Sequence, residues 1–566
     1  MVIMSLLASL LIAEAATLLD GSLVNRLMLV VAVALAVGGL AAMGQPRVWY
    51  RRLTDRLLYG VPWGTLLVML LLVAVYGGLQ DGFGASEPIV LPFRAWSYLD
   101  PAGMIVAGLA HSNTSHLLGN LLGLLLFGSL VEFLWGHHTQ RRTATRLERA
   151  WTHPVVRAVV VVPTVAVTVS IIGSLVALGP VIGFSIVVFA LAGFALVQRP
   201  ILTVVVSVSQ GVARRLFAAF QAPEQIATSG TTYSTPWFAS IAIQGHAVGL
   251  LGGVIAGLAY QRLTDRSRPP AGRLWAGVLL FGIERSLWAV YWYRGNDSYV
   301  LYRAIGVGLV FLLATVVTYA VVARNRPIAP QYAAADPDSF LADLTTISGR
   351  QVGLLVVVVV GAALVAPAIA TNATTAADGD LPGEPIEIQG YELTYGENVT
   401  NGQLNVIDVE GVGESTRINT SGVIVRNTDR HIWSTAVTTA ELSADGDTAI
   451  RLGGLTWQET VTASRTGWQA VGGSTTYRVT LTHDNRTRPL YNTGTVKAEP
   501  VIAGQQVALD ATDDGFRVGV GDSLGDLPPP NGSVELGRLT LRRQGSRLVA
   551  VNNQTQTAVR VADKVN

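Results

Sequence analysis

The chain has 566 residues, of which 50% are hydrophobic and only 14% are charged, and its mean hydropathy is +0.43. Up to about residue 370 the apolar residues form uninterrupted blocks of about twenty, which excludes a soluble globular protein. Residues 371–566 are polar and carry a net charge of −7, so the total of +2 leaves +9 for the rest. The chain contains no cysteine, which excludes disulfides, thiol catalysis and Cys-based zinc sites. No stretch alternates arginine with aromatic residues as a nucleic-acid surface would, so we expect no nucleic-acid partner.

Apolar blocks long enough for membrane helices, about 17 to 25 residues, predict eleven spans. The blocks are Val2 to Leu19, Arg26 to Met43, Val61 to Leu79, Ser115 to Trp135, Val155 to Leu178, Ser185 to Val197, Ile201 to Phe220, Trp237 to Tyr260, Leu274 to Trp292, Tyr299 to Val322 and Val352 to Ala370. The first block lacks a basic segment and a cleavage site, so we expect a retained anchor. The sixth is too short to cross a core of about 30 Å and must begin part-way down. The seventh is the weakest prediction, since Gln210, Arg214 and Arg215 interrupt it.

Arginines in the loops predict the orientation of the spans. Four clusters fall on one side of the membrane if there are eleven spans: Arg47, Arg51, Arg52 and Arg56; Arg141, Arg142, Arg146 and Arg149; Arg262, Arg266, Arg268 and Arg273; and Arg324 and Arg326. Because basic loops stay in the cytoplasm, we expect a multi-pass cell-membrane protein with a cytoplasmic N-terminus and an extracytoplasmic tail after Ala370. Six Asn-x-Ser/Thr tripeptides in the tail, beginning at Asn372, agree with that side.

Polar side chains inside apolar blocks are costly unless they pair or line a wet cavity, so they mark candidate functional positions. His116 and Asn120 share one helix face at the start of the fourth span. Ser185 begins the short sixth span, where free backbone N–H groups and the helix dipole favour a developing anion. Taken singly, a self-capping helix start and a serine bonded to its own helix are the simpler interpretations.

The eighth span adds a histidine and a glycine groove. Gly249, Gly253 and Gly257 recur every four residues and allow another helix to approach closely. His246 stands on the same face, one turn above, and alone it is as readily a packing residue. If the Ser185 helix docks in the groove, His246 comes within reach of the Ser185 hydroxyl, which would form a nucleophile and base pair.

In this order and on these spans, the three clusters resemble the rhomboid family of intramembrane serine proteases over residues Val61 to Tyr260. The motifs are His-x-x-x-Asn at His116 and Asn120, Gly-x-Ser at Gly183 and Ser185, and His-x-x-Gly-x-x-x-Gly at His246, Gly249 and Gly253, with Phe127, Gly128, Glu132, Gly136 and Phe189 as further matches. Two features depart from the family. Ile186 replaces the glycine that usually follows the serine, and beside the substrate channel it could narrow the site or weaken activity. The family's Trp-Arg pair in the first outer loop is missing, and Arg94-Ala95-Trp96 is its nearest substitute.

The resemblance implies a six-helix core in which Ser185 attacks the scissile carbonyl and His246 is the base. It also implies that the Ser185 backbone N–H, His116 and Asn120 hold the oxyanion, that Phe189 packs beside the histidine, and that no cofactor or metal takes part. Substrates would be single-span membrane proteins whose helix unwinds near the outer face. The loop from Thr228 to Thr235, with Ser229 and Gly230 as hinge, is expected to act as a lid.

These observations predict an α-helical polytopic membrane protein followed by a β-rich extracytoplasmic domain. The expected parts are a pair of N-terminal transmembrane helices (1–60), a rhomboid-like core (61–260), three additional transmembrane helices with a cytoplasmic loop (261–370) and a β-sandwich-like domain (371–566). In the last part, turn residues separate short alternating runs, and His431 and His483 are expected to be isolated and solvated.

Other classes of function stay open. A catalytically weak or inactive rhomboid-like scaffold that binds membrane proteins is supported by Ile186. A transporter is supported by the span count and by Glu284, Arg285 and Arg303, although these charges could pair with each other and no inverted repeat is evident. The chain has no His-Glu-x-x-His motif of a metalloprotease, and its Gly-x-Gly-Asp match at Gly519 to Asp522 lies in the polar tail.

Overall fold

The structure is a computed structural model that describes residues 21–44, 46–84, 87–136, 153–224, 233–323, 348–373, 379–403, 418–454 and 456–566. The predicted first span, the arginines at 141–149 and 324–326, and most of the predicted lid lie outside these residues.

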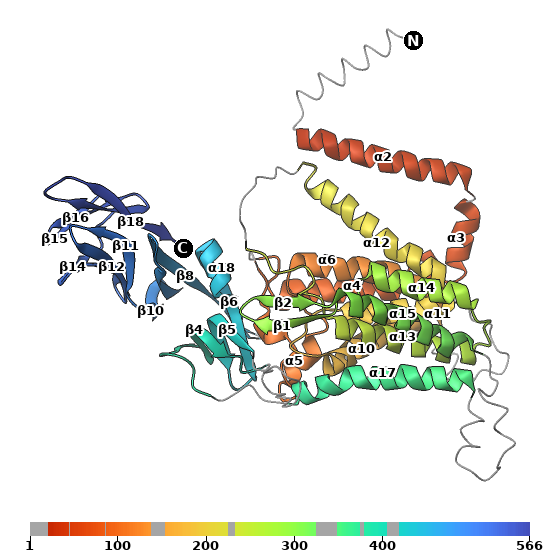
Figure 1. The fold of residues 1–566 in the computed structure, drawn as a ribbon. Helices are drawn as coiled ribbons and strands as arrows, with labels where there is room; N and C mark the ends of the chain where they lie inside the picture. The colour runs from red at the N-terminus through yellow and green to blue at the C-terminus, as the bar shows by residue number, and fades with distance from the viewer. Residues whose placement is uncertain are drawn as a thin grey trace, which may run out of the picture.

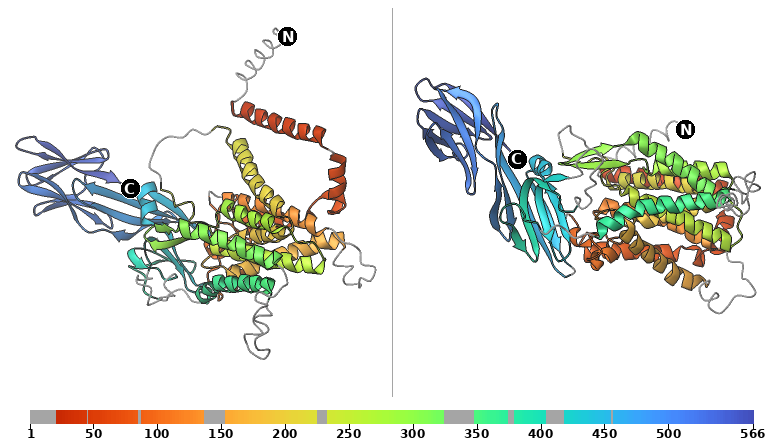
Figure 2. Two further views of the ribbon diagram at one scale, coloured as in Figure 1. Left: turned by 45° about the vertical axis from the view of Figure 1, so that its right-hand side comes forward. Right: turned by 60° about the horizontal axis from the view of Figure 1, so that its bottom comes forward.

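The first part of the described chain is a helical bundle, and the β-rich part lies at one end of it (Figure 1 and Figure 2). The helices are α2 (Gly21–Met43), α3 (Pro46–Thr54), α4 (Trp63–Ala74), α5 (Pro101–Val106), α6 (Thr114–Gly123), α7 (Ser129–Trp135), α9 (Pro154–Val156), α10 (Val162–Val176), α11 (Ser185–Gln198), α12 (Pro200–Gln221), α13 (Ile243–Leu263), α14 (Ala271–Glu284), α15 (Arg303–Val322) and α17 (Gly349–Asn372). The π-helical turns η2 (Val75–Leu79), η4 (Leu124–Gly128) and η5 (Arg157–Val161) extend α4, join α6 to α7 and join α9 to α10.

Seven helical stretches in the described residues are long and apolar enough to cross a membrane. They are Ser22–Met43, Thr114–Trp135, Pro154–Val176, Pro200–Gln221, Ile243–Leu263, Arg303–Val322 and Gly349–Asn372, and Trp63–Leu79 and Ser185–Gln198 are shorter apolar helices. The membrane-protein class is therefore supported, whereas the count of eleven spans is not reproduced.

The main departure from the predicted spans lies between α14 and α15. The ninth block was expected to reach Trp292, but α14 ends at Glu284, and a hairpin of β1 (Tyr291–Gly295) and β2 (Ser298–Leu301) follows. Asn296 and Asp297 take positive φ angles of 45° and 57° at its tip, a conformation that these residues tolerate well. An Asn-Asp pair between alternating aromatic residues is a hairpin signal, which the hydropathy of the block concealed. The predicted starts of the eighth and tenth spans were also too early, because α13 begins at Ile243 and α15 at Arg303.

Helix α12 is continuous, and Gln210, Arg214 and Arg215 do not interrupt it. Its first half is tied to the bundle, because Gln210 Nε2 donates to Gly119 O at 2.8 Å. Its second half is exposed from Arg214 to Gln221 and diverges from the bundle (Figure 1). There the end of α12 meets the start of α2, where the Arg26 side chain donates to Phe220 O at 2.9 Å.

Helix α11 lies at the centre of the bundle and packs directly against α13, as the predicted glycine groove requires. A Cβ on Gly253 would lie 1.9 Å from Ala190 O, and one on Gly193 would lie 2.2 Å from Leu250 O. Since neither distance leaves room for a side chain, only glycine permits this approach of the two backbones. On another side of the core, the buried Glu132 carboxylate accepts the Thr65 N–H at 2.9 Å and so caps the start of α4.

The β-rich C-terminal part is present as expected and is antiparallel throughout its described strands. Its elements are β3 (Ile386–Ile388), β4 (Tyr391–Thr400), β5 (Asn419–Asn427), β6 (Ile432–Thr438), α18 (Thr439–Asp445), β7 (Asp447–Gly453), β8 (Gln458–Ala470), β9 (Thr475–His483), β10 (Arg486–Asn492), β11 (Val496–Ile502), β12 (Gln505–Thr512), β13 (Gly515–Val520), β14 (Ser523–Asp526), β15 (Ser533–Leu536), β16 (Leu539–Gln544), β17 (Arg547–Asn552) and β18 (Ala558–Val565). Three sheets form: β3-β4-β5-β6, β10-β9-β8-β18-β17-β16-β15 with β7 on β8, and β11-β12-β13-β14. They enclose two hydrophobic clusters, one around Tyr391 and Val479 and one around Trp468 and Leu541.

Two ion pairs fasten the β-rich part to the loop between η2 and α5. Arg430 Nη2 lies 3.1 Å from Asp100 Oδ2, and Arg451 Nη2 lies 2.9 Å from Asp81 Oδ2. The loop also donates the Tyr98 N–H to Asn372 O at 2.8 Å. Opposite this end, α3 runs across the direction of the bundle helices and carries three of the predicted arginines (Figure 1).

Two expectations about the tail residues were wrong. Asn372 is fully buried at the end of α17 and its amide donates to Ala177 O at 2.9 Å, so the folded chain does not expose it as a glycosylation acceptor. His483 is not isolated, because its Nε2 lies 3.3 Å from Glu459 Oε2 and 3.9 Å from Asp484 Oδ2.

Candidate active site

Ser185 and His246 meet between α11 and α13. Ser185 is the first residue of α11, His246 lies in the first turn of α13, and His246 Nε2 lies 2.9 Å from Ser185 Oγ. The serine is presented by a sharp turn, since Gly183 has φ +112° and donates its N–H to Ala107 O at 2.9 Å. The hydroxyl therefore stands at a helix start with a base beside it, the arrangement that activates a nucleophile.

Phe189 holds the histidine ring in place. It lies one turn after Ser185 on α11, and its ring stacks on the His246 imidazole with centroids 4.2 Å apart and planes 9° from parallel. His246 Nδ1 has no hydrogen-bond partner among the described residues. In the part of the chain that the structure describes, packing rather than a carboxylate thus orients the imidazole.

His116 and Asn120 lie over the turn that precedes the serine. A Cβ on Gly183 would lie 2.6 Å from His116 Nε2 and 3.5 Å from Asn120 Nδ2, so only glycine fits beneath these side chains. Asn120 Nδ2 is buried and has no hydrogen-bond partner in the described part of the chain. His116 Nδ1 lies 3.0 Å from Ser112 Oγ. When Ser112 donates this bond, His116 Nε2 carries the ring proton toward the turn.

Two further polar residues stand close in sequence to the candidate histidines but were not predicted as site residues: His111 opens the polar segment that contains His116, and Gln244 precedes His246. His111 is fully buried edge-on to His116, with centroids 5.2 Å apart, and neither of its ring nitrogens has a partner among the described residues. Gln244 accepts the Leu178 N–H at 3.0 Å and donates to Val176 O and Leu364 O, both at 2.9 Å. Each stands within five residues of a predicted site histidine, which is the signal that could have drawn attention to them.

Ile186 was expected beside the substrate channel, and in the structure its side chain is buried. It is only 8% exposed, and its side chain points into the packing of α10 and α13. A Cβ on Gly173 would lie 3.0 Å from Ile186 Cγ2, and one on Gly245 would lie 3.1 Å from Ile186 Cδ1. The branched side chain therefore fills space that these two glycines leave.

The loop between η2 and α5 braces the segment that leads to Ser185. Arg94 Nη1 donates to Pro180 O at 3.3 Å, and the Ala95 N–H donates to Val181 O at 3.0 Å. Trp96 Nε1 donates to Leu91 O at 2.6 Å within the same loop. The Arg94-Ala95-Trp96 segment thus lies against the serine turn despite its unexpected order.

The described end of the α12–α13 loop is held by the β1–β2 hairpin. Tyr291 Oη donates to Ala239 O at 2.7 Å, and the Phe238 ring packs against Tyr291 with centroids 5.5 Å apart. Thr438 Oγ1, at the end of β6, lies 3.2 Å from Tyr233 Oη. The segment that enters α13 just before His246 is therefore attached to the hairpin and to the β-rich part.

The charged residues of α14 take part in packing. Arg285 Nε lies 2.9 Å from Glu284 Oε2, and Arg285 also donates to Gln210 Oε1 and Ser207 Oγ on α12, at 2.5 and 2.7 Å. Of the pairing considered from the sequence, the contact between Glu284 and Arg285 is thus observed.

Comparison with known proteins finds no family model, no curated protein and no solved structure that matches this chain. The chemistry that the site can perform therefore has to be judged from its own geometry. That geometry combines a hydroxyl, an imidazole within hydrogen-bond distance and the side chains of His116 and Asn120 over the preceding turn, which is a constellation suited to acyl transfer.

Proposed function

We propose that the chain is an intramembrane serine endopeptidase of the rhomboid type, with Ser185 as nucleophile and His246 as general base. The observation that carries the proposal is the 2.9 Å contact between the Ser185 hydroxyl and the His246 imidazole, at the start of a short apolar helix. The alternative of a serine that bonds only to its own helix does not account for a histidine beside the hydroxyl. It also does not account for the Phe189 ring that stacks on this histidine.

In the proposed reaction, His246 Nε2 takes the Ser185 proton as Oγ attacks the scissile carbonyl carbon, and the carbonyl oxygen becomes an oxyanion. His246 then delivers the proton to the leaving amine, and a water repeats both steps to release the acyl group from Ser185. The Ser185 backbone N–H, Asn120 Nδ2 and His116 Nε2 are the donors for the oxyanion. The unpartnered Asn120 amide supports this role, because a buried donor without a bond is otherwise costly.

The proposed substrates are single-span membrane proteins whose helix unwinds near the site, since an intact helix shields its carbonyls. The exposed second half of α12 offers a route from the bilayer toward α6, which bears His116 and Asn120. In the proposed orientation the arginines of α3 face the cytoplasm. The β-rich part is then extracytoplasmic, on the side where Ser185 begins its helix, and its proposed role is contact with substrate ectodomains.

The test uses the purified full chain, a single-span test substrate and a fluorophosphonate probe. Ser185→Ala and His246→Ala should each abolish cleavage, and Ser185→Ala should also abolish labelling by the probe. Ser174→Ala is the matched control, because this buried serine bonds Ser170 O in its own helix at 3.3 Å. Substantial cleavage by either dyad variant with a folded, inserted chain would refute the proposal.

A non-cutting scaffold is the second candidate. In the sequence, the scaffold hypothesis is supported by Ile186 after the serine. The inward packing of the Ile186 side chain weakens that support. A chain that binds the test substrate but neither cleaves it nor reacts with the probe would favour the scaffold.

A further inference from the structure

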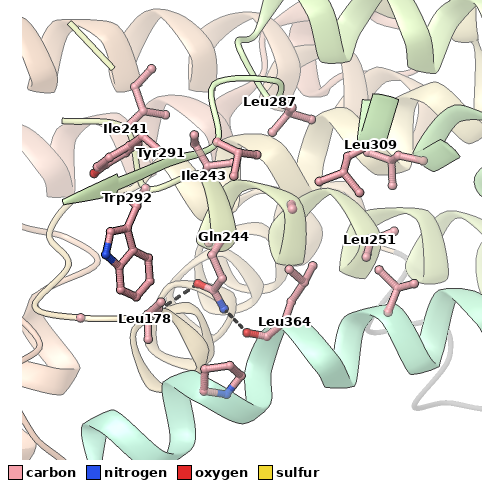
Figure 3. Close-up of a pocket in the computed structure, with 18 of the residues that line it drawn as sticks. Leu178, Ile241, Ile243, Gln244, Leu251, Leu287, Tyr291, Trp292, Leu309 and Leu364 are labelled. Atoms are coloured by element: carbon pink, nitrogen blue, oxygen red, sulfur yellow. Dashed lines mark hydrogen bonds between the residues drawn. The ribbon is translucent and has the colours of Figure 1, made fainter. Parts of the chain in front are cut away.

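An apolar cavity of about 1010 Å³ lies on the side of α13 away from the Ser185 helix. Its walls come from α13, α15 and α17, and the β1–β2 hairpin forms its outer end (Figure 3). Ile243 and Leu251 line it from α13, Leu313 from α15, and Val360 and Leu364 from α17. No residue of the rhomboid-like motifs is needed to form it, so it is separate from the candidate active site.

The cavity is closed toward the end of the bundle opposite the β-rich part, where α15 and α17 come together. A Cβ on Gly353 would lie 2.6 Å from Ala320 N, and one on Gly349 would lie 2.7 Å from Tyr319 Oη. The lining residues of α17 run from Val357 to Thr371. At 1.5 Å per residue this is about 21 Å, short of the roughly 30 Å that a spanning helix crosses. The cavity therefore has the depth of an acyl chain and not of a transmembrane helix.

The chemistry of the lining agrees with an uncharged occupant. None of its lining residues is Asp, Glu, Lys, Arg or His. The Gln244 amide is already bonded to Leu178 N and Leu364 O (Figure 3). It also donates to Val176 O, so it offers little to a polar ligand. Neutral apolar walls match a hydrocarbon chain in charge as well as in polarity.

The outer end of the cavity carries aromatic residues. Tyr291, Trp292, Tyr293 and Tyr299 line it from the hairpin. Rings with one polar edge gather at the level of lipid headgroups, where the apolar part faces the chains and the polar part meets water. Apolar surface lies next to the cavity, because Val359 and Leu355 of α17 are exposed beside its lining residues. A lipid can thus enter sideways without crossing a polar barrier.

We propose that this cavity is a binding site for the acyl chain of an outer-leaflet membrane lipid, with its headgroup at the Tyr291–Tyr299 level. The bound chain would support α13 from behind, since Gln244 and Ile243 stand two and three residues before His246. The binding itself does not depend on the proposed proteolysis, whereas the assignment to the outer leaflet rests on the proposed orientation of the chain.

The test is photolabelling of the full chain in phosphatidylcholine vesicles that contain a phosphatidylcholine with a diazirine in one acyl chain. After irradiation, labelled residues are mapped by mass spectrometry. Label should be several-fold higher at Leu313 of α15 and Val360 of α17, which line the cavity, than at Val359. Val359 also lies on α17 but is exposed and does not line the cavity. Equal labelling of Val359 and Val360 would mean annular lipid alone and would overturn the proposal.

Two filling variants from opposite walls and one matched control complete the test. Val360→Trp should lower the label at Leu313 several-fold, Leu313→Trp should do the same at Val360, and Val359→Trp should leave both unchanged. Each variant must remain monodisperse by size-exclusion chromatography, so that loss of label reports occupancy and not unfolding. Label that is unchanged in a folded filling variant would refute the site. A photoreactive residue at position 360 that cross-links in native membranes to protein instead of lipid would refute it as well.

Discussion

The contact between α11 and α13 makes a sharp prediction about two adjacent glycines. A Cβ on Gly253 would lie 1.9 Å from Ala190 O, whereas a Cβ on Gly252 would meet nothing within 4 Å. Gly253→Ala must therefore push the two helices apart, while Gly252→Ala adds a methyl group to an exposed surface. The two substitutions are identical in chemistry and adjacent in sequence, so their difference isolates the helix contact.

The magnitude follows from the overlap. Ordinary contacts of a Cβ begin at about 3.4 Å, so relief of the clash takes a displacement on the order of 1 Å, shared between the helices. Overpacking of this kind costs about 1 to 3 kcal/mol of unfolding free energy. Because Ser185 and His246 sit on the two helices that separate, a shift of about 1 Å should also cost about 10²-fold in cleavage rate.

The assays are thermal unfolding of the purified chain and the initial rate of cleavage of a single-span substrate. Gly252→Ala should match the native chain in rate and be equal or slightly higher in stability, since alanine favours a helix by about 1 kcal/mol over glycine. Gly253→Ala should lose both stability and rate. Native values of both quantities for Gly253→Ala would show that the helix contact does not hold the dyad together.

Further predictions concern single positions. Ile186→Gly should destabilise the chain by about 2 to 5 kcal/mol in thermal unfolding without raising the cleavage rate, because the side chain fills a packed interior; a faster enzyme would return Ile186 to the channel. Asn120→Ala should lower kcat about 10²-fold and keep residual cleavage, because two other oxyanion donors remain; an unchanged kcat would exclude Asn120 from that role. Tyr291→Phe should weaken the hold on the Ala239 loop by about 1 kcal/mol, seen as faster hydrogen exchange at residues 236–241; unchanged exchange would mean that the aromatic packing alone suffices. A tag after Asn566 should be open to protease on intact cells, and a tag shielded until lysis would reverse the proposed orientation.

Short-range patterns predicted the elements that carry the site. The four-residue glycine spacing on α13 anticipated its contact with α11, and the shortness of the sixth block anticipated a helix that starts at Ser185. Both patterns are set by the geometry of one helix, so the sequence contains them directly. If the two helices docked through the groove, Ser185 and His246 were expected to come into contact. In the structure, Ser185 Oγ lies 2.9 Å from His246 Nε2.

Features that depend on two distant segments were not predictable in the same way. Hydropathy joined Leu274 to Trp292 into one block because tyrosine and tryptophan count as apolar, whereas α14 ends at Glu284 and the last two residues of the block, Tyr291 and Trp292, begin the hairpin that turns at Asn296 and Asp297. Ile186 was expected to obstruct the substrate channel because the motif gives only its position after Ser185. The motif does not reveal that the side chain packs against Gly173 and Gly245, which lie on other helices. Asn372 was expected to be an exposed glycosylation acceptor because its tripeptide fits the acceptor pattern. Its burial comes from a contact with the distant Ala177, whose carbonyl accepts a hydrogen bond from the Asn372 amide.

The parts of the chain outside residues 61–260 contact both segments that lead into the dyad. From one side, the β1–β2 hairpin holds Ala239 in the segment before His246, and α17 accepts a hydrogen bond from Gln244. From the other side, the β-rich part holds Asp100 through Arg430, in the loop whose Arg94 contacts Pro180 before Ser185. Movement of the β-rich part would therefore be transmitted to Ser185 and to His246 through separate contacts. If the proposed proteolysis is correct, Arg430→Ala should change cleavage of a substrate with a folded ectodomain more than cleavage of one without it. Equal effects on the two substrates would limit Arg430 to a structural role.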